Sequence, residues 1–516
     1  MTSRVVSEPQ RQEIWKALDE LAKRHRAFPD ARWVMPSGEI AEVEKLAAKF
    51  LPADALTRLE FLFNSHAPDL GIPRTQDFEG YEAKVADARI AAVREIERTT
   101  GLDGIKRLRD VVKEPYFLGW AVAAADLKLS SSDLATELES DNATQINFGL
   151  GYARKRFDNM NLEWTKSILP DLDGHAVAQA RVLRMSTTFP DAWEIAASLG
   201  PEIEASYWRE FMPVGLGSDF RFINELTRSL LAHGRTNAAV DLLALYSDRT
   251  EPPAEPTLIA DALEALIDAP GTDIQIAPYH LQSLLDVLRA GNFDEERLAV
   301  IEWRLLPALG YGVPAPTLER RLATDPTFFV QILSMAFKRS DGTEDPRPTP
   351  EVARNAFHVL QEWQIVPGSN ARGGIVDEDR LNQWLDNVRE LLSAVDRSDI
   401  GALYIGHVFA HAKEDDDATW PTLAVRNSIE RLANDYIQRG FGEQIHNNRG
   451  VTSRGLTDGG QQERELATKF AHWEELIRNR WPRTASVLRS IADGYKAQGR
   501  WQDEEAERTR QGIDSR

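Results

Sequence analysis

Apolar residues recur along most of this chain at the three- and four-residue spacing that places side chains on one face of an α-helix. Ile14, Leu18 and Leu21 form one such face. The alternation of apolar and polar residues that is typical of a β-strand is rare, and its best example, residues 274–276, is too short to form a sheet. The pattern therefore predicts an all-α protein with well over half of its residues in helices and almost none in strands.

Proline- and glycine-rich stretches interrupt this pattern. Proline lacks an amide donor and fixes φ, so such stretches end helices. The clearest of them are residues 68–73, 251–256, 340–350 and 367–375. Pro256 and Pro350 are expected to lie in the first turn of a helix, where the missing donor has no consequence. We expect three helical regions, at residues 1–250, 257–340 and 350–516.

One segment has the pattern of a helix pair. In residues 226–248 an apolar-faced helix, the turn His233-Gly234-Arg235 and a second amphipathic helix follow one another. Gly234 suits the turn because glycine adopts positive φ at low cost. Residues 495–507 have the same pattern. These pairs predict an irregular α-solenoid of antiparallel helix pairs, similar to tetratricopeptide (TPR) or HEAT repeats but without a strict repeat period.

The charge balance narrows the choice of partner. The chain carries 81 acidic and 61 basic residues and a formal net charge of −20, and a surface this acidic repels a phosphate backbone. We therefore expect no non-specific nucleic-acid binding by the surface as a whole, and a partner surface that is basic or apolar. The arginines of a C-terminal loop, at residues 447–460, are the candidates for a local basic patch. The sequence has no cysteine, no apolar run long enough to span a membrane and no signal peptide at its start, which fits a cytoplasmic protein without disulfides or thiolate metal sites.

A loop rich in glycine, asparagine and arginine, at residues 447–460, precedes a predicted helix. Glycines before a helix N-terminus can hold an anion through backbone N–H groups, so one hypothesis is a ligand-binding protein or enzyme that uses this loop for a phosphate-bearing molecule. The alternative is a structural connector whose arginines pair with carboxylates such as Asp458 and Glu463, and in which the paired glycines give a tight turn into the helix. Both hypotheses involve the same candidate residues, Arg449, Arg454, Gly459, Gly460, Glu463 and Arg464.

No motif for catalysis or metal binding is evident. The sequence has no GxSxG nucleophile motif, no kinase motif set and no HExxH. His407 and His411 are four residues apart and would share a helix face, with Asp415–Asp417 nearby, but packed histidines and a solvated acidic loop are the simpler interpretation. We predict no catalytic residue, no metal site and no cofactor. Most of the 13 tryptophans have apolar neighbours, which predicts that they anchor helix packing.

Several segments are similar to the helical C-terminal region of large bacterial STAND-type P-loop ATPases, many of them linked to anti-phage defence. These segments are Lys23–Pro36, Gly200–Phe211, Asp294–Leu309, Asp325–Phe337 and Asn447–Trp473. The last is the most specific, and the chain itself lacks a Walker A loop and a recognisable effector domain. The resemblance implies a non-catalytic sensing or scaffolding module that binds a protein partner, such as a phage-encoded protein or an effector or ATPase subunit. It is also compatible with a homo-oligomer.

Overall fold

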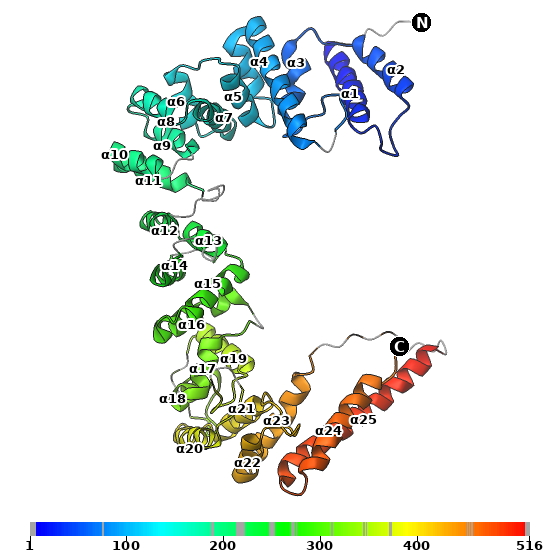
Figure 1. The fold of residues 1–516 in the computed structure, drawn as a ribbon, viewed down its shortest axis with the longest axis vertical. Coiled ribbons are helices and arrows are strands. Elements are labelled where there is room, and N and C mark those ends of the chain that lie inside the picture. Colours follow the sequence, from blue (N-terminus) through cyan, green and yellow to red (C-terminus); the bar gives the residue numbers. More distant parts are fainter. Residues whose placement is uncertain are drawn as a thin grey trace. The chain divides into compact units, whose positions relative to one another are not determined.

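The computed structural model is built of α-helices (Figure 1). It describes residues 7–74, 77–186, 190–212, 222–246, 253–269, 274, 276–310, 313–343, 346, 348–370, 374–450, 453, 455 and 458–510. These residues contain no β-strand, and a single isolated β-bridge joins Ser369 to Val376. The predicted all-α class is thereby confirmed. Within the same residues, none of the helices combines the length and the apolar character that a membrane crossing requires.

The helices form two compact units. The N-terminal unit comprises Met1–Ala239 with Arg249–Pro252, and the C-terminal unit comprises Val240–Asp248 with Pro253–Arg516. The boundary between them falls within α13 (Thr236–Tyr246). The sequence-based division into three regions stays a prediction.

The N-terminal unit holds α1 to α12. Their bounds, with two 3₁₀ turns, are α1 Glu8–Ala27, α2 Ser37–Ala48, α3 Ala55–Leu59, η1 Glu60–Phe63, α4 Phe78–Arg109, α5 Pro115–Ala124, α6 Ser131–Glu139, α7 Ala143–Met160, α8 Leu162–Ile168, η2 Pro170–Leu172, α9 Ala176–Met185, α10 Asp191–Leu199, α11 Pro201–Glu210 and α12 Ile223–Ala232. The side chains of Asp77, Ser130 and Asn142 each accept a hydrogen bond from a backbone N–H of the following helix, which stabilises its first turn. The long α4 is kinked at Gly101, whose φ is +66°.

The C-terminal unit holds α14 to α25, together with the end of α13. Their bounds are α14 Pro256–Asp268, α15 Pro278–Ala290, α16 Glu295–Leu309, α17 Pro316–Thr324, α18 Pro326–Ala336, α19 Pro350–Glu362, α20 Glu378–Ala394, α21 Ser398–Phe409, α22 Leu423–Leu432, α23 Asp435–Asn447, α24 Gln461–Ile477 and α25 Pro482–Arg510. As predicted, α14 begins at Pro256 and α19 begins at Pro350. The Thr349 hydroxyl accepts a hydrogen bond from the N–H of Val352 at 3.3 Å and so caps α19.

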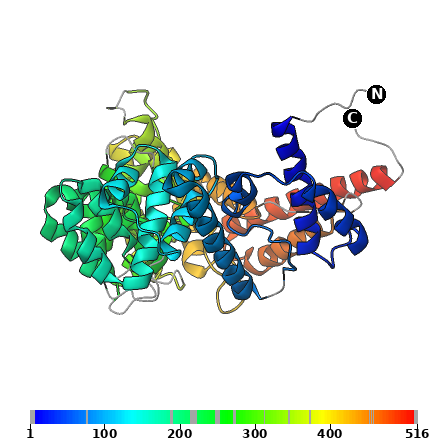
Figure 2. The ribbon, with the colours of Figure 1, turned by 90° about the horizontal axis from the view of Figure 1, so that it is seen from above.

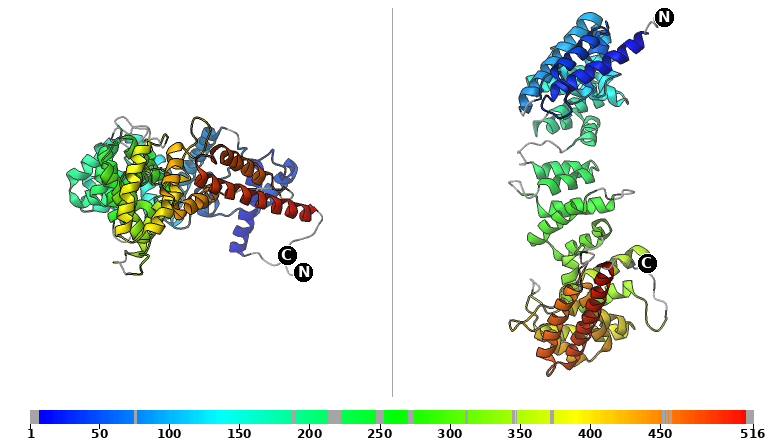
Figure 3. Two further views of the ribbon diagram at one scale, coloured as in Figure 1. Left: turned by 90° about the horizontal axis from the view of Figure 1, so that it is seen from below. Right: turned by 90° about the vertical axis from the view of Figure 1, so that its right-hand side faces the viewer.

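Helices pack against near neighbours in chain order. Among the described residues, the helices in extensive contact are at most three positions apart along the chain, and the largest contacts are those of α5 with α7, α21 with α23 and α24 with α25. The last two helices lie side by side along much of their length (Figures 2 and 3). One hydrophobic core is formed by α3 to α9, and another by α16 to α25.

Glycines permit the closest of these crossings in the N-terminal unit. A Cβ atom at Gly119 of α5 would lie 1.9 Å from the carbonyl oxygen of Phe148 in α7. A Cβ atom at Gly151 of α7 would lie 2.0 Å from the carbonyl oxygen of Tyr116 in α5. Because the two glycines are reciprocal, the backbones of α5 and α7 approach more closely than any larger residue would permit.

The same arrangement recurs in the C-terminal unit. A Cβ atom at Gly440 of α23 would lie 2.0 Å from the carbonyl oxygen of Leu403 in α21. A Cβ atom at Gly460, directly before α24, would lie 2.1 Å from the carbonyl oxygen of Gly499 in α25. The three most extensive helix contacts of the described chain therefore all depend on a glycine at the crossing.

Tryptophans anchor the C-terminal core, as the sequence predicts. The ring of Trp363 is 5.2 Å from that of Phe329, and the ring of Trp420 is 5.0 Å from that of Trp473, measured between centroids. All four side chains are buried. Trp501 of α25 is an exception, since 55% of its surface is exposed.

In one of the two segments predicted as helix pairs, two helices joined by a turn are present, and the prediction for the other segment is wrong. Residues 226–248 contain parts of α12 and α13, separated by a turn in which Gly234 has a φ of +68°. Residues 495–507, by contrast, lie within the continuous helix α25. Gly499 serves the close approach to Gly460 there, and it does not end a helix.

Candidate functional site

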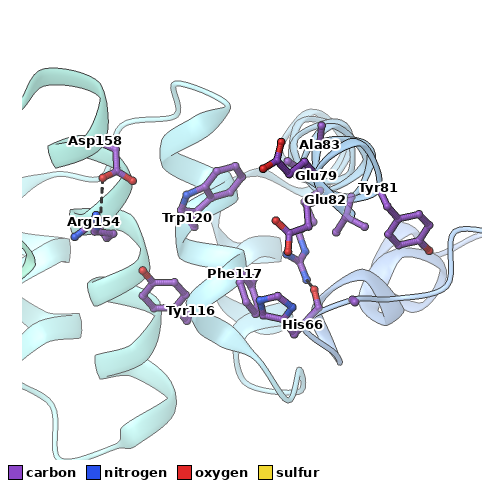
Figure 4. A pocket seen from close by; sticks show the side chains of 14 residues that line it. His66, Glu79, Tyr81, Glu82, Ala83, Tyr116, Phe117, Trp120, Arg154 and Asp158 are labelled. Carbon is purple, nitrogen blue, oxygen red and sulfur yellow. Dashed lines mark hydrogen bonds and ion pairs between the residues drawn. The ribbon is translucent and has the colours of Figure 1, made fainter. Parts of the chain in front are cut away.

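The N-terminal unit contains a cavity between α4, α5, α7 and the segment that precedes α4. Its volume is about 490 Å³. Rings and charged groups are combined in its lining, which is the composition expected of a binding site. The lining residues are His66, Ala67, Glu79, Tyr81, Glu82, Ala83, Val85, Ala86, Arg89, Tyr116, Phe117, Trp120, Arg154 and Asp158 (Figure 4).

Helix α4 supplies two carboxylates to this cavity. Glu79, Glu82 and Ala86 follow the three- and four-residue spacing that puts side chains on one helix face. Both glutamates are exposed to solvent. Arg89, three residues beyond Ala86, is buried.

The Arg89 guanidinium forms part of the cavity wall. Its Nε donates a hydrogen bond to the carbonyl oxygen of Leu62 at 2.9 Å. Its Nη2 donates to the carbonyl oxygens of Ser65 and His66, at 2.8 and 3.1 Å. The guanidinium carbon lies 4.1 Å from the ring centroid of Phe117. Burial lowers the pKa of Arg89 to about 10, so this group remains charged at neutral pH.

Helices α5 and α7 supply the rings and an ion pair. Tyr116, Phe117 and Trp120 of α5 lie on one side of the helix and are half-buried. Arg154 and Asp158 are one turn apart on α7, and their Nε and Oδ1 atoms are 3.0 Å apart (Figure 4). The close crossing of α5 and α7 holds these two groups of side chains in register.

The sequence analysis missed this cavity. Its lining comes from several segments between His66 and Asp158, and none of them carries a recognised motif. The one signal is the cluster of three rings in Tyr116–Trp120 beside an apolar stretch. Apolar spacing alone does not show that these rings face a cavity.

The predicted loop at residues 447–460 lies between α23 and α24. Arg449 Nη2 forms an ion pair with Glu463 Oε1, and Glu463 is fully buried in the first turn of α24. The Arg449 guanidinium also lies 5.4 Å from the ring centroid of Tyr495. The structural-connector hypothesis expects a pairing of this kind. Arg454, the other candidate arginine, lies outside the described residues.

The paired glycines lead into α24 for a different reason from the one predicted. Gly460 has a φ of −77°, which any residue can adopt, so glycine is required there by the approach to Gly499. A Cβ atom at Gly459 would lie 2.3 Å from Asp503 Oδ1. The Gly460 N–H donates to the same oxygen at 2.8 Å, and Arg464 Nη1 pairs with Asp503 Oδ2 at 2.5 Å. The candidate residues therefore join the start of α24 to α25.

His407 and His411 do not share a helix face, because α21 ends at Phe409, between them. The Nε2 atom of His407 lies 3.7 Å from Glu443 Oε2. The Nε2 atom of His411 lies 3.4 Å from Gln444 Nε2. Burial lowers the pKa of both imidazoles, that of His411 to about 4. Within the described part of the chain, no group of three or more His, Asp or Glu side chains could hold a metal ion.

The expectation of a solvated acidic loop at Asp415–Asp417 is incomplete, because Asp415 makes structural hydrogen bonds. Its Oδ2 accepts hydrogen bonds from the Leu423 N–H at 2.8 Å and from Arg426 Nη2 at 2.5 Å. Its Oδ1 accepts from the Thr422 hydroxyl at 2.7 Å. Asp415 therefore stabilises the start of α22.

Comparison of this chain with protein-family models, with curated proteins and with solved structures finds no match. The resemblance to STAND-type ATPases therefore stays a prediction. A function for the chain rests on the packing and the chemistry of its own residues.

Proposed function

We propose that this chain is a non-catalytic helical protein-interaction module, built as an irregular α-solenoid of antiparallel helix pairs. The observation that carries the proposal is the packing order, since described helices in extensive contact are at most three positions apart along the chain. Repeat arrays have this property because each unit buries its apolar face against its neighbours. Such arrays present extended surfaces to their partners.

The partner is a protein with a basic or apolar surface. The net charge of −20 attracts basic surfaces and repels the phosphate backbone of nucleic acids. By its sequence resemblance, the module acts as a sensor or scaffold in a bacterial anti-phage defence system. A phage-encoded protein, or an effector or ATPase subunit, is the corresponding partner.

Capture followed by reconstitution tests this function. The tagged full chain is used to capture proteins from phage-infected and uninfected bacterial lysates at low salt, and each captured protein is then purified and recombined with the chain. We expect one of them to bind again, with a Kd that rises with salt because an acidic surface attracts it. Failure to recover any protein that rebinds contradicts the proposal. ATP hydrolysis or nuclease activity that follows the chain through purification, and is lost on mutation of a surface site, also contradicts it.

The alternative function uses the loop at residues 447–460 for a phosphate-bearing molecule. Arg449 is already paired with the buried Glu463, and this pairing supports the structural hypothesis over the ligand hypothesis. A thermal-shift screen with nucleotides, cyclic nucleotides and inorganic phosphate distinguishes them, because a ligand raises the Tm by mass action. A rise in the Tm of the wild type that Arg449→Ala abolishes would favour the ligand site.

A further inference from the structure

We propose that the cavity of the N-terminal unit binds an arginine side chain that a basic protein partner presents. This inference rests on the proposed function, and it names the chemistry by which the partner is recognised. Its basis is the combination, in one cavity of about 490 Å³, of carboxylates that form no ion pair with another described residue, partly accessible rings, and two resident arginines whose N–H groups have other partners.

Glu79 and Glu82 are the groups that attract a cation. Both line the cavity from α4, one turn apart, and both are exposed. No ion pair joins either carboxylate to another of the described residues. Arginine fits such a pair better than lysine does, because the planar guanidinium presents several N–H donors in a fixed geometry to carboxylate oxygens.

The rings of α5 are suited to a planar cation. The guanidinium carbon of Arg89 lies 4.1 Å from the ring centroid of Phe117, and Lys155 Nζ lies 5.0 Å from that of Trp120. Two of the rings that line this cavity therefore already interact with cations inside the chain. A guanidinium can use ring faces in the same way and also stack on them through its own plane.

Trp120 lies between the two helices that contribute carboxylates to the cavity. In Figure 4 its indole lies between Glu79 of α4 and Asp158 of α7, and Tyr116 lies on the α7 side. Trp120 and Tyr116 are half-buried, so parts of both rings remain accessible. The aliphatic stem of an arginine can lie on these rings while its guanidinium reaches Glu79 and Glu82.

The two arginines of the cavity do not use these carboxylates. Arg89 donates to the carbonyl oxygens of three residues in the preceding segment. Arg154 is paired with Asp158 at 3.0 Å. Arg154 is thus paired with a carboxylate, and the Nε and Nη2 groups of Arg89 donate to carbonyl oxygens, whereas no ion pair with another described residue engages Glu79 or Glu82. An incoming guanidinium is directed to the Glu79 and Glu82 end of the cavity.

An exposed aromatic residue that precedes Glu79 in the sequence favours a protein as the source of the arginine. Phe78, the first residue of α4 and the neighbour of Glu79, is 78% exposed. Aromatic residues and charged anchors together are typical of the energetic centre of a protein–protein contact. A free arginine molecule would leave Phe78 in solvent, while a protein surface would cover it.

Binding of defined peptides tests the assignment. The probe is a fluorescent peptide of Gly-Arg-Gly repeats, compared by anisotropy with a citrulline version that keeps the shape of arginine without its charge. The full chain is used at about 0.15 M ionic strength, where attraction beyond about 8 Å is largely screened. We expect the citrulline peptide, and a lysine version, to bind about tenfold more weakly or worse.

A charge-matched pair of variants locates the site. Glu79→Gln with Glu82→Gln should weaken arginine-peptide binding about tenfold. The control variant, Glu163→Gln with Asp171→Asn, changes the net charge by the same amount at exposed residues of the same unit that do not line the cavity. It should leave the Kd within about twofold, because only long-range attraction is altered. All four side chains are exposed, so both variants should fold, which circular dichroism checks.

Three results would overturn the inference: equal binding of the citrulline peptide, equal binding of the lysine peptide, or an equal loss in the charge-matched control. A reconstituted partner that binds the Glu79 and Glu82 variant with unchanged Kd would remove the cavity assignment and leave the proposed function intact. Failure to find any partner that rebinds would instead remove the proposed function.

Discussion

The carboxyl group of Glu319 in α17 is a buried acid that titrates near neutrality. Glu319 is 5% exposed, and its Oε2 accepts a hydrogen bond from the Gln364 N–H at 3.1 Å. Burial raises the pKa of Glu319 to about 7, and the nearby Glu302 adds to the rise. An unfolded glutamate titrates at about 4.3. Between these two pH values the folded chain holds the proton more tightly, so the contribution of this group to stability falls as the pH rises.

We predict that Glu319→Gln removes this loss of stability. The amide is uncharged and keeps an oxygen that can accept from the Gln364 N–H. The variant should be more stable than the wild type by about 1–3 kcal/mol above pH 7, and the difference should shrink towards pH 5. Urea unfolding across this range measures it, with Glu351→Gln, an exposed position in α19, as the control. A difference that is independent of pH would show that Glu319 is not the titrating group.

The ion pairs of the C-terminal loop predict an asymmetry between two arginine substitutions. Arg449→Ala removes a cation from the fully buried Glu463, which should cost about 2–4 kcal/mol of unfolding free energy. Arg464→Ala breaks a solvent-exposed pair with Asp503 and should cost less than about 1 kcal/mol. Urea unfolding of the two variants provides the comparison. Equal and small losses would show that the loop is a tether without a structural role.

Contacts between residues that are close in the sequence could be predicted from the sequence. Contacts that depend on how distant helices pack together could not. Arg449 and Glu463 are separated by one loop, so their pairing could be foreseen from local composition. His66 and Asp158 belong to one cavity because η1, α4, α5 and α7 pack together. The period of apolar residues predicts that each helix has a buried face, but it does not tell which helices meet.

At the scale of helices, replacing glycine with alanine should have opposite effects on the free energy of unfolding at a close helix crossing and away from one. Gly440→Ala in α23 puts a Cβ atom 2.0 Å from the Leu403 carbonyl oxygen, so α21 and α23 must separate, at a cost of about 1–3 kcal/mol. Gly494→Ala in α25 meets no atom within 4 Å, so the better helix propensity of alanine should stabilise the chain by about 0.5–1 kcal/mol. Urea unfolding gives both signs. Stabilisation by both substitutions would contradict the close crossing of α21 and α23.

The glycines of these crossings show where local rules mislead. The pattern at residues 495–507 predicts a turn because glycine frequently ends helices. In the structure α25 continues through Gly499, and a Cβ atom at Gly460 would lie 2.1 Å from the Gly499 carbonyl oxygen, so this position is one of close approach. In the sequence, a glycine that permits positive φ cannot be distinguished from one that permits the close approach of two backbones. Only the position of the partner helix separates the two roles.

At the scale of the whole molecule, the all-α class could be predicted and the extent of each core could not. Apolar spacing recurs in every region, so the class does not depend on how the helices meet. The loop-like stretch at residues 340–350 lies between helices α18 and α19, which both contribute to the same hydrophobic core. The composition of a loop does not tell whether the helices on its two sides share a core.

Because one hydrophobic core lies within the N-terminal unit and another lies within the C-terminal unit, we predict that the parts of the chain around these two cores lose structure in separate steps. Leu118 is fully buried in the core of the N-terminal unit, and Leu385 is fully buried in that of the C-terminal unit. Replacing either leucine with alanine should cost its own unit about 2–5 kcal/mol, through lost burial and the cavity that remains. Hydrogen exchange followed by peptide mass spectrometry can report each unit in the same sample. We expect Leu118→Ala to lower protection in the N-terminal unit alone and Leu385→Ala to lower it in the C-terminal unit alone. If either substitution lowered protection equally in both, the chain would unfold as one cooperative body.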